Sequence, residues 1–250
     1  MNPHTFIDIR LSIENKIGRI VINRPEKLNA IRIQTYREII AALQHADNSD
    51  DCHLIVLEGE GGQFTAGNDL ADLVDGDADQ VMQCVEGIFN TVDQLKKVLI
   101  CVVEGVAVGI GTTLLLHCDI AVASTSAKFR LPFVNLGVCP EGGASTLLPQ
   151  AIGQKAAREL LLTGRFFSAQ EAYSWGLITA ITEPEKIRKK VEEYISSILQ
   201  QPQSSLTATK ELMRQSKGDV GNAVTRELQM FAKLLQSEQT RNRITALLKR

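Results

Sequence analysis

Residues 98–118, VLICVVEGVAVGIGTTLLLHC, decide the fold class of this chain. The run is apolar enough to be mistaken for a transmembrane helix, and Glu104 is the only acid in it. Three glycines, at positions 105, 109 and 111, interrupt the run. Because strands and helices give similar apolar runs, such glycines help to divide one element from the next. We therefore interpret the stretch as a buried strand, a glycine turn and a short buried helix.

The segments on either side of this stretch alternate between the two kinds of element. Residues 17–25 (IGRIVINRP) show the alternation of a strand, and residues 53–62 (HLIVLEGEGG) form a short apolar run that ends in glycines. Apolar residues recur at helical spacing in 33–47 and 78–97, and 118–124 (CDIAVAS) predicts another strand. Strands that alternate with helices over this length predict an α/β fold.

The pattern changes after about Phe167, where the sequence predicts helices only. These cover 168–177, 183–201, 202–217 and 224–250. Leu228, Phe231, Leu234 and Leu235 lie at helical spacing and should pack either on the protein's own core or on another subunit. We therefore divide the chain into a core at 1–195 that holds the functional site and a helical region at 196–250, which we expect to take part in oligomerisation.

The composition is that of a globular protein. The 250 residues are 44% hydrophobic and 22% charged, with a formal net charge of −2, so we expect neither a nucleic acid nor a membrane as partner. The five cysteines contain no C-x-x-C pair and predict reduced thiols without a metal site. The N-terminal residues lack the apolar segment of a secretory signal, and the last residues are not a peroxisomal tripeptide. We expect a cytoplasmic protein.

Two glycine-containing segments could approach a ligand with their backbone. Residues 61–70 (GGQFTAGNDL) lead from a strand into a new helix, and they fit equally well a plain loop in which Asn68 or Asp69 caps that helix. Residues 105–116 (GVAVGIGTTLLL) place glycines before an apolar helix, whose first N–H groups could face a negatively charged oxygen. Leu114 stands where a dinucleotide fingerprint requires a small residue, which disfavours a nicotinamide site.

A third segment, 131–149 (LPFVNLGVCPEGGASTLLP), carries Glu141 between Pro140 and two glycines. An acid at this place could simply stabilise the N-terminus of the following helix, which is worth about 0.3–1 kcal/mol. Taken alone, the residues favour this structural role over a functional carboxylate, since acids are common in the first turn of a helix. Cys139 is nearby, but no histidine is close in sequence and we expect a buried, inert thiol. His117 suits the C-terminal end of a helix as a donor.

Taken together and in order, four motifs resemble those of the crotonase family, the enoyl-CoA hydratases and isomerases. They are NRPEKLNAI (23–31), FTAGNDL (64–70), GVAVGIGTTLLLHCDI (105–120) and FVNLGVCPEGG (133–143), and the resemblance extends from about Gly18 to about Ala180. It implies a spiral of strand-strand-helix units with an all-α C-terminal region, assembled as a homotrimer or hexamer. The partner it implies is an acyl-CoA thioester, with coenzyme A as part of the substrate and no further cofactor or metal.

The resemblance also implies the residues of the site. The backbone N–H groups of Ala66 and Ile110 would hold the thioester oxygen as an oxyanion hole. Coenzyme A would pass the backbone of residues 27–30 and 68–70, although an exposed lysine in a turn, as at position 27, is also explained by solvation alone. The residues implied to bind substrate or coenzyme A are Lys27, Leu28, Ala30, Gly67, Asn68, Asp69, Leu70, Gly109, Thr113, Phe133 and Leu136.

Two departures from the family pattern bear on the reaction. By motif, Thr113 and Phe133 occupy the positions of the two glutamates with which the hydratases activate water, and neither side chain can act as a carboxylate. The PEG context of Glu141 is similar to that of the Δ3,Δ2-enoyl-CoA isomerases, in which this glutamate is the acid and base. Apolar neighbours at Phe133, Leu136 and Val138 should raise its pKa.

The resemblance thus implies an isomerase that moves a double bond from position 3 to position 2 of an enoyl-CoA. Glu141 would shuttle one proton through a dienolate that the oxyanion hole stabilises. Two alternatives remain open. One is an enoyl-CoA hydratase or another acyl-CoA reaction on the same scaffold, and the other is a non-catalytic subunit that binds acyl-CoA.

Overall fold

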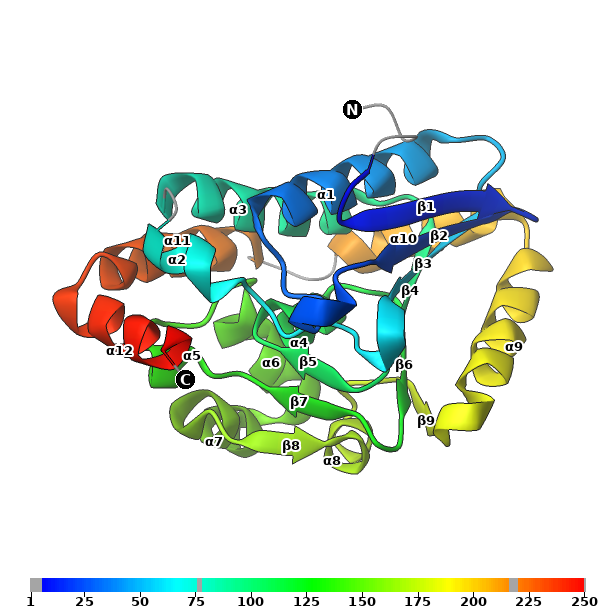
Figure 1. Cartoon of the computed structure of the whole chain (residues 1–250). Helices are drawn as coiled ribbons and strands as arrows, with labels where there is room; N and C mark the ends of the chain where they lie inside the picture. Colours follow the sequence, from blue (N-terminus) through cyan, green and yellow to red (C-terminus); the bar gives the residue numbers. More distant parts are fainter. Residues whose placement is uncertain (1–5, 76–77, 216–219, 250) are drawn as a thin grey trace.

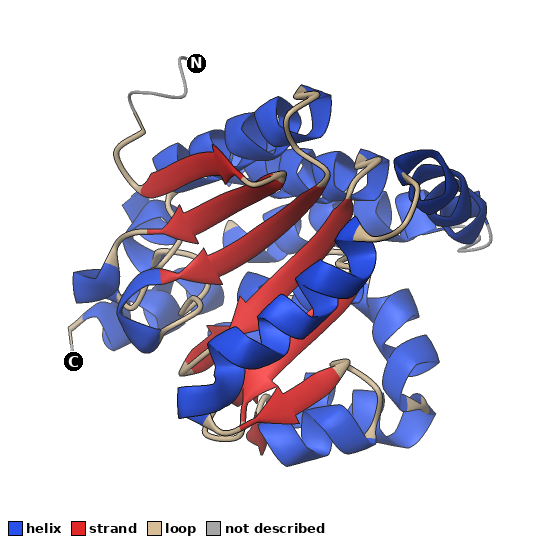
Figure 2. Cartoon of the chain, turned by 90° about the vertical axis from the view of Figure 1, so that its right-hand side faces the viewer, coloured by secondary structure: helices blue, strands red, loops and turns tan. Residues whose placement is uncertain are grey.

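A six-stranded sheet forms the centre of the protein. The computed structural model describes residues 6–75, 78–215 and 220–249. The sheet has the order β1-β2-β3-β4-β6-β9, and only β1 runs antiparallel to its neighbour (Figure 2). Its strands are β1 (Ile9–Glu14), β2 (Ile17–Ile22), β3 (Leu54–Gly59), β4 (Val98–Val103), β6 (Ile120–Ser124) and β9 (Ala180–Thr182).

A second sheet of three strands branches from the first one. It consists of β5 (Val106–Val108), β7 (Lys128–Arg130) and β8 (Phe166–Ser168), with β7 in the middle. Gly105, with φ of +59°, turns the chain from β4 into β5. A bridge between Thr65 and Ala107 attaches the segment that follows β3 to this small sheet. The two candidate ligand loops are therefore brought side by side.

Helices cover the sheets. Helices α1 (Ile33–Asn48) and α3 (Ala78–Gln94) pack against each other, while α9 (Ile187–Leu199) packs on β3 and β6 (Figure 1). The remaining α-helices are α2 (Leu70–Asp75), α4 (Ile110–Thr113), α5 (Phe133–Leu136), α6 (Ala144–Ile152), α7 (Gln154–Thr163), α8 (Ala169–Ser174), α10 (Gln203–Gln215), α11 (Val220–Leu235) and α12 (Glu238–Leu248). The 3-10 helices are η2 (Pro25–Lys27), η3 (Glu60–Gly62), η4 (Leu114–Leu116) and η5 (Pro184–Lys186).

The structure confirms the buried strand and the short helix predicted within residues 98–118, as β4 and α4, but a further short strand, β5, lies between them. All six residues of β4 are buried, because the parallel sheet is covered on both faces. Leu99, Cys101 and Val103 enter one hydrophobic cluster, and the alternate residues enter the other. Within the described residues, we find no helix with the length and hydrophobicity that crossing a bilayer requires.

The C-terminal third differs from the predicted run of helices. β8 and β9 lie within or next to it, and three-residue strands are too short to show a periodic pattern. The segment 224–250 is two helices, because Ser237 caps a new helix through its hydrogen bond with the N–H of Thr240. Residues 216, 217 and 250 of the predicted helices lie outside the described residues.

Helices α11 and α12 fold back on the body of the chain. Helix α11 packs on α3 and α6, and α12 packs on α2 and α5 (Figure 1). Leu228, Phe231 and Leu235 are buried in the main hydrophobic cluster. Of the two environments predicted for these side chains, the protein's own core is the one observed; oligomerisation stays a prediction.

Candidate active site

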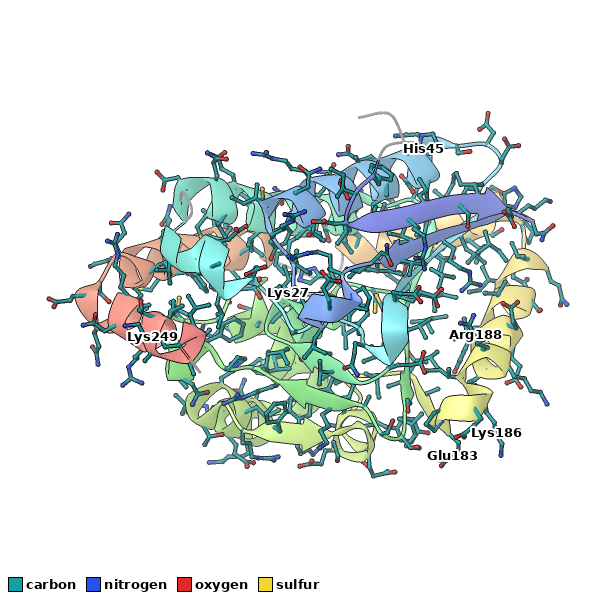
Figure 3. The ribbon with its side chains drawn as sticks, viewed as in Figure 1. Lys27, His45, Glu183, Lys186, Arg188 and Lys249 are labelled. Carbon is teal, nitrogen blue, oxygen red and sulfur yellow. The ribbon has the colours of Figure 1, made fainter. Side chains whose placement is uncertain are left out.

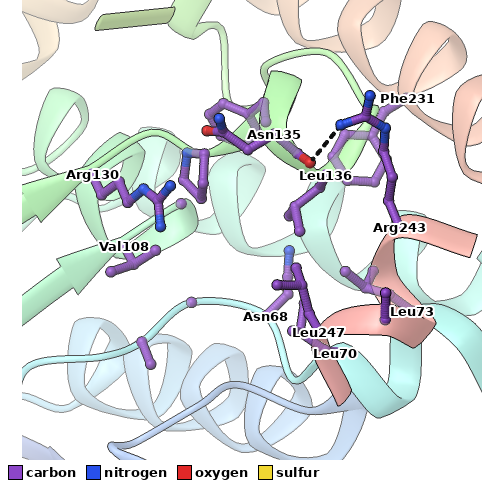
Figure 4. Close-up of a pocket in the computed structure, with 16 residues that line it drawn as sticks. Asn68, Leu70, Leu73, Val108, Arg130, Asn135, Leu136, Phe231, Arg243 and Leu247 are labelled. Atoms are coloured by element: carbon purple, nitrogen blue, oxygen red, sulfur yellow. Dashed lines mark hydrogen bonds between the residues drawn. The ribbon is translucent and has the colours of Figure 1, made fainter. Parts of the chain in front are cut away.

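An apolar cavity of about 430 Å³ lies between the three-stranded sheet, the segment that leads into α2, and the last helices (Figure 4). Segment 66–73 forms one wall, β5 to Gly109 and the start of α5 form the second, and α12 faces them with Arg243 and Leu247. The residues that line it are Ala66, Gly67, Asn68, Leu70, Leu73, Val108, Gly109, Arg130, Pro132, Phe133, Asn135, Leu136, Phe231, Arg243, Ala246 and Leu247.

Hydrogen bonds at Ala66 correct one predicted donor of the oxyanion hole. Its backbone N–H already donates to the carbonyl oxygen of Leu28, at 2.9 Å. Two other donors of this segment are also engaged, since the N–H of Gly67 donates to Oγ1 of Thr65 and that of Asp69 to the carbonyl oxygen of Ile31. Because an engaged N–H would have to give up its acceptor to bind a ligand, Ala66 is a poor oxyanion donor.

Asn68 is the better candidate from this segment. It forms a parallel bridge with Ile31, in which the neighbouring residues 67 and 69 make both hydrogen bonds. The backbone N–H of Asn68 therefore points away from Ile31, and it has no acceptor among the described residues. Its side chain is fixed separately, because Oδ1 accepts a hydrogen bond from the hydroxyl of the buried Tyr36.

The predicted donor Ile110 is the first residue of α4, directly after the cavity residue Gly109. A helix cannot satisfy its own first N–H groups, and among the described residues the N–H of Ile110 has no acceptor. Gly109, with φ of +55°, turns the chain from β5 into this helix, and its own N–H donates to the carbonyl oxygen of Arg130. Asn68 and Ile110 thus provide two available N–H groups on neighbouring segments.

Glu141 is buried, with 1% of its surface exposed. Its Oε1 accepts a 2.7 Å hydrogen bond from the hydroxyl of Thr113 on α4, while its Oε2 has no partner among the described residues. Burial raises the pKa of Glu141 to about 8, the hydrogen bond from Thr113 acts in the opposite direction, and the charge of Glu227 raises it further. The direction is the one predicted, with burial as its largest cause.

The turn that carries Glu141 is tightly constrained. Gly142 and Gly143 have φ of +69° and +70°, and a Cβ on Gly142 would lie 2.4 Å from the ring of Phe89. Nε2 of His117 lies 2.6 Å from the carbonyl oxygen of Gly142, so this ring nitrogen must carry a proton and donate. The two glycines allow a conformation that other residues adopt only with strain.

Glu227 on α11 is a residue that the sequence analysis did not single out. Its carboxylate accepts hydrogen bonds from the backbone N–H groups of Gly143, at 2.6 Å, and Ser145, at 2.8 Å. The sequence offered one signal: Glu227 is an acid among the apolar side chains, such as Leu228 and Phe231, on one face of a helix. That signal predicts a paired or hydrogen-bonded acid but does not identify its partner.

The sequence model of the enoyl-CoA hydratase/isomerase family matches residues 12–250. The chain belongs to this family. It is 34% identical over 225 residues to enoyl-CoA delta isomerase 2 of Rattus norvegicus, covering 88% of this chain but only 57% of the rat protein. It is also 27% identical to a short-chain-enoyl-CoA hydratase of Clostridium acetobutylicum, covering 97% and 95% of the two chains.

Solved structures of the enoyl-CoA hydratase/isomerase family share the whole fold. An enoyl-CoA hydratase/isomerase from Pseudoalteromonas atlantica T6c superposes with a TM-score of 0.89, at 32% identity and 97% coverage of both chains. An enoyl-CoA hydratase from Mycobacterium avium subsp. paratuberculosis K-10 superposes with a TM-score of 0.91, at 26% identity, covering 98% of this chain and 97% of that one. The expected crotonase fold is therefore confirmed.

The structure gathers part of the set that the family resemblance implied. Ala66, Gly67, Asn68, Leu70, Gly109, Phe133 and Leu136 line the cavity. Ile110, Thr113 and Glu141 lie outside this lining, as do Lys27, Leu28, Ala30 and Asp69.

Four residues that were predicted to bind coenzyme A lie outside the cavity lining. Leu28 and Ala30 lie on the loop between β2 and α1, and Lys27 is exposed at the end of η2 (Figure 3). Asp69 is held by an ion pair with Arg24, at 3.2 Å, and its Oδ1 accepts the N–H of Ala71 in the first turn of α2. The capping role left open for Asp69 is thus observed.

The cavity also contains two arginines that the sequence analysis did not consider. Arg130 donates from Nε to the carbonyl oxygen of Gly164, and Arg243 donates to the carbonyl oxygen of Asn135 at 3.4 Å (Figure 4). Neither forms an ion pair with a described carboxylate. Their charges suit a cavity that receives an anionic ligand.

The expected inertness of Cys139 fits its surroundings. Burial raises the pKa of this thiol to about 11, so that it is protonated at neutral pH. Its Sγ lies 3.5 Å from the carbonyl oxygen of Glu227. Since the thiolate is the nucleophilic form, a role for Cys139 in covalent catalysis is disfavoured.

Proposed function

We propose that this protein is a Δ3,Δ2-enoyl-CoA isomerase in which Glu141 carries the proton. The observation that supports this most strongly is the asymmetry of the Glu141 carboxyl group. Thr113 holds Oε1 at 2.7 Å, and Oε2 is buried without a partner among the described residues. A buried carboxyl group with a pKa of about 8 exchanges protons near neutral pH, as a general base and acid must.

The reaction needs one proton to move between two carbons. In a 3-enoyl thioester, the carbonyl group and the double bond both acidify the C2 proton. Oε2 of Glu141 takes this proton, the C2–H bond breaks, and the electron pair spreads as a dienolate over the thioester oxygen, C2 and C4. The same carboxyl group then returns the proton to C4, which leaves a double bond between C2 and C3.

The N–H groups of Asn68 and Ile110 would hold the thioester oxygen as negative charge develops on it. One such donor is worth about 3 kcal/mol in other oxyanion holes. Coenzyme A would follow residues 27–30 and 68–70, as the resemblance implies, and its phosphates are matched in charge by Arg130, Arg243 and the exposed Lys27. Because Glu141 does not line the cavity, contact with C2 requires the lining side chains to adjust when the substrate binds.

Hydration is the alternative, and the names of several relatives favour it. The hydratase of C. acetobutylicum is matched over 97% of this chain. In the present chain, however, Thr113 and Phe133 stand where the family resemblance implies the two hydratase glutamates, and Phe133 is buried. Neither a threonine hydroxyl group nor a phenyl ring can act as a carboxylate, so the site lacks both of the acid-base groups that hydration by two carboxylates requires.

Two assays on the purified protein separate the reactions. One follows the conversion of 3-hexenoyl-CoA to the 2-enoyl product, and the other follows water addition to 2-hexenoyl-CoA. The proposal requires isomerisation with hydration at least about 100-fold slower, the size of one lost general acid-base group. Hydration at a comparable rate would reject it in favour of a hydratase, and binding without turnover of either substrate would indicate a non-catalytic acyl-CoA-binding subunit.

A further inference from the structure

Glu227 lies more than 80 residues after Glu141 in the sequence, and it accepts hydrogen bonds from the turn that carries Glu141. It lies on α11 and has 7% of its surface exposed. Oε2 accepts the N–H of Gly143 at 2.6 Å and Oε1 accepts the N–H of Ser145 at 2.8 Å. Gly143 is the N-cap residue of α6, so a buried carboxylate satisfies donors that the helix itself leaves unpaired.

The same turn is held from a second direction. His117 donates from Nε2 to the carbonyl oxygen of Gly142, and its ring packs on Phe89 with centroids 4.8 Å apart. Phe89 also fills the space next to the Cα of Gly142. The peptide groups that follow Glu141 are therefore fixed by an acceptor on α11, a donor beyond η4 and an aromatic ring on α3, which leaves little freedom for the carboxyl group.

We propose that Glu227 is a positioning residue for Glu141, which sets the place of the Glu141 carboxyl group and, through its own negative charge, the ease with which that group takes up a proton. The inference rests on the proposed function, because it treats Glu141 as the acid and base. Glu227 does not line the cavity and is not a catalytic residue itself.

The other titratable groups around Glu141 support an electrostatic role for Glu227. Burial, together with the charge of Glu141, raises the pKa of Tyr36 on α1 well above 10 and that of Cys139 on the same loop to about 11. Both are neutral at pH 7. Burial raises the pKa of Glu227 as well, while the N–H groups of Gly143 and Ser145 favour its ionised form.

Three variants separate the contribution of geometry from that of charge. Glu227→Ala removes both hydrogen bonds and the charge, Glu227→Asp keeps the charge on a shorter arm, and Glu227→Gln keeps one acceptor oxygen without the charge. Glu171→Gln is the matched control, because Glu171 belongs to the capping box of α8 and faces Ser168.

The kinetic expectation follows from displacement of the base. Misplacing a catalytic group by about 1 Å can cost on the order of 100-fold in rate. We expect Glu227→Ala to lower kcat for 3-hexenoyl-CoA by roughly 10- to 100-fold with little change in KM. Glu227→Asp should recover part of this loss, and the Glu171→Gln control should match the wild type.

The electrostatic expectation is measured without turnover. The infrared band of the protonated Glu141 carboxyl group is identified as the one that disappears in Glu141→Gln, and it is then titrated in the wild type, Glu227→Gln and Glu171→Gln. Removing the negative charge of Glu227 should move the Glu141 titration to lower pH, because the ionised form of Glu141 loses a repulsive neighbour. The Glu171→Gln titration should coincide with that of the wild type.

The kinetic assay and the infrared titration test different claims, so that the result of one can contradict its claim while the other claim still holds. A wild type that does not isomerise 3-hexenoyl-CoA rejects the proposed function, while the infrared titration still decides whether Glu227 controls the protonation of Glu141. A folded Glu227→Ala with kcat within about twofold of the wild type, or a Glu141 titration that is unchanged in Glu227→Gln, overturns the positioning role. Should the alanine variant fail to fold, the Gln and Asp variants decide by the same criteria.

Discussion

The hydroxyl group of Thr113 donates a 2.7 Å hydrogen bond to Oε1 of Glu141, and both side chains are buried. By the family resemblance, Thr113 stands where hydratases carry a glutamate. The contact therefore replaces a second carboxylate with a neutral donor, which orients the remaining carboxyl group and favours its ionised form. Proton shuttling by one base fits this arrangement.

Activity should rise with pH in the neutral range. A base with a pKa of about 8 is about one-tenth ionised at pH 7, and the ionised form is the one that removes the C2 proton. We expect kcat/KM for 3-hexenoyl-CoA to increase through pH 7 and level off above about pH 8 to 9. The pH dependence of kcat/KM tests this directly, and a profile that is flat from pH 6 to 9 would contradict the assignment.

Replacing Thr113 should change the pH dependence in a defined direction. Thr113→Val keeps the shape of the side chain but removes the donor to Oε1, so the pKa of Glu141 should rise and the ascending limb of kcat/KM should move to higher pH. Thr113→Ser retains the hydroxyl group and serves as the control. Equal profiles for the Val and Ser variants would show that the hydrogen bond does not tune Glu141.

The raised pKa of Glu141 also predicts an effect on stability. The group has a pKa of 4.5 in the absence of its surroundings and about 8 in the folded chain, so between these values the folded state binds more protons than the unfolded state. Stability from this group therefore falls as pH rises from about 4.5 to 8.

Glu141→Gln removes this penalty and should raise the melting temperature at pH 8.5 by more than it does at pH 5. The gain in the free energy of unfolding is at most a few kcal/mol, or roughly 1.4 kcal/mol per unit of pKa. Thermal unfolding at the two pH values measures it. A variant that is destabilised equally at both pH values would mean that the folded state does not disfavour the ionised form of Glu141.

The turn after Glu141 should tolerate no side chain at Gly142. Gly142→Ala combines a positive φ, costing about 1–2 kcal/mol, with a Cβ that would lie 2.4 Å from Phe89, so the turn must move and kcat should fall. Gly62→Ala is the control, because Gly62 also has a positive φ but nothing lies within 4 Å of the added Cβ. Similar kcat values for the two variants would contradict the account of this turn.

Much of the fold follows from the sequence, for physical reasons that are visible in particular segments. The glycines of 98–118 separated a strand buried on both faces from a helix, and the structure has both elements. Strand β9 was missed because three residues show no period. The region after Phe167 was consequently predicted as helical throughout.

The site was predicted less completely, because the hydrogen-bond partners of its residues come from distant parts of the chain. The motif implied Ala66 as a backbone donor, but the N–H of Ala66 donates to the carbonyl oxygen of Leu28, whereas the N–H of Asn68 has no acceptor among the described residues. Glu227 was missed because its partners Gly143 and Ser145 lie in a distant part of the chain. Only the fold brings these groups together.

The rate of isomerisation in Glu141→Gln, compared with the wild type on 3-hexenoyl-CoA, tests the central claim most directly. Binding of saturated hexanoyl-CoA serves as the control for an intact site. The account predicts a loss of roughly 100- to 10,000-fold in kcat with unchanged binding, which is the usual contribution of a general base. A variant that isomerises within a few-fold of the wild type would contradict Glu141 as the group that carries the proton.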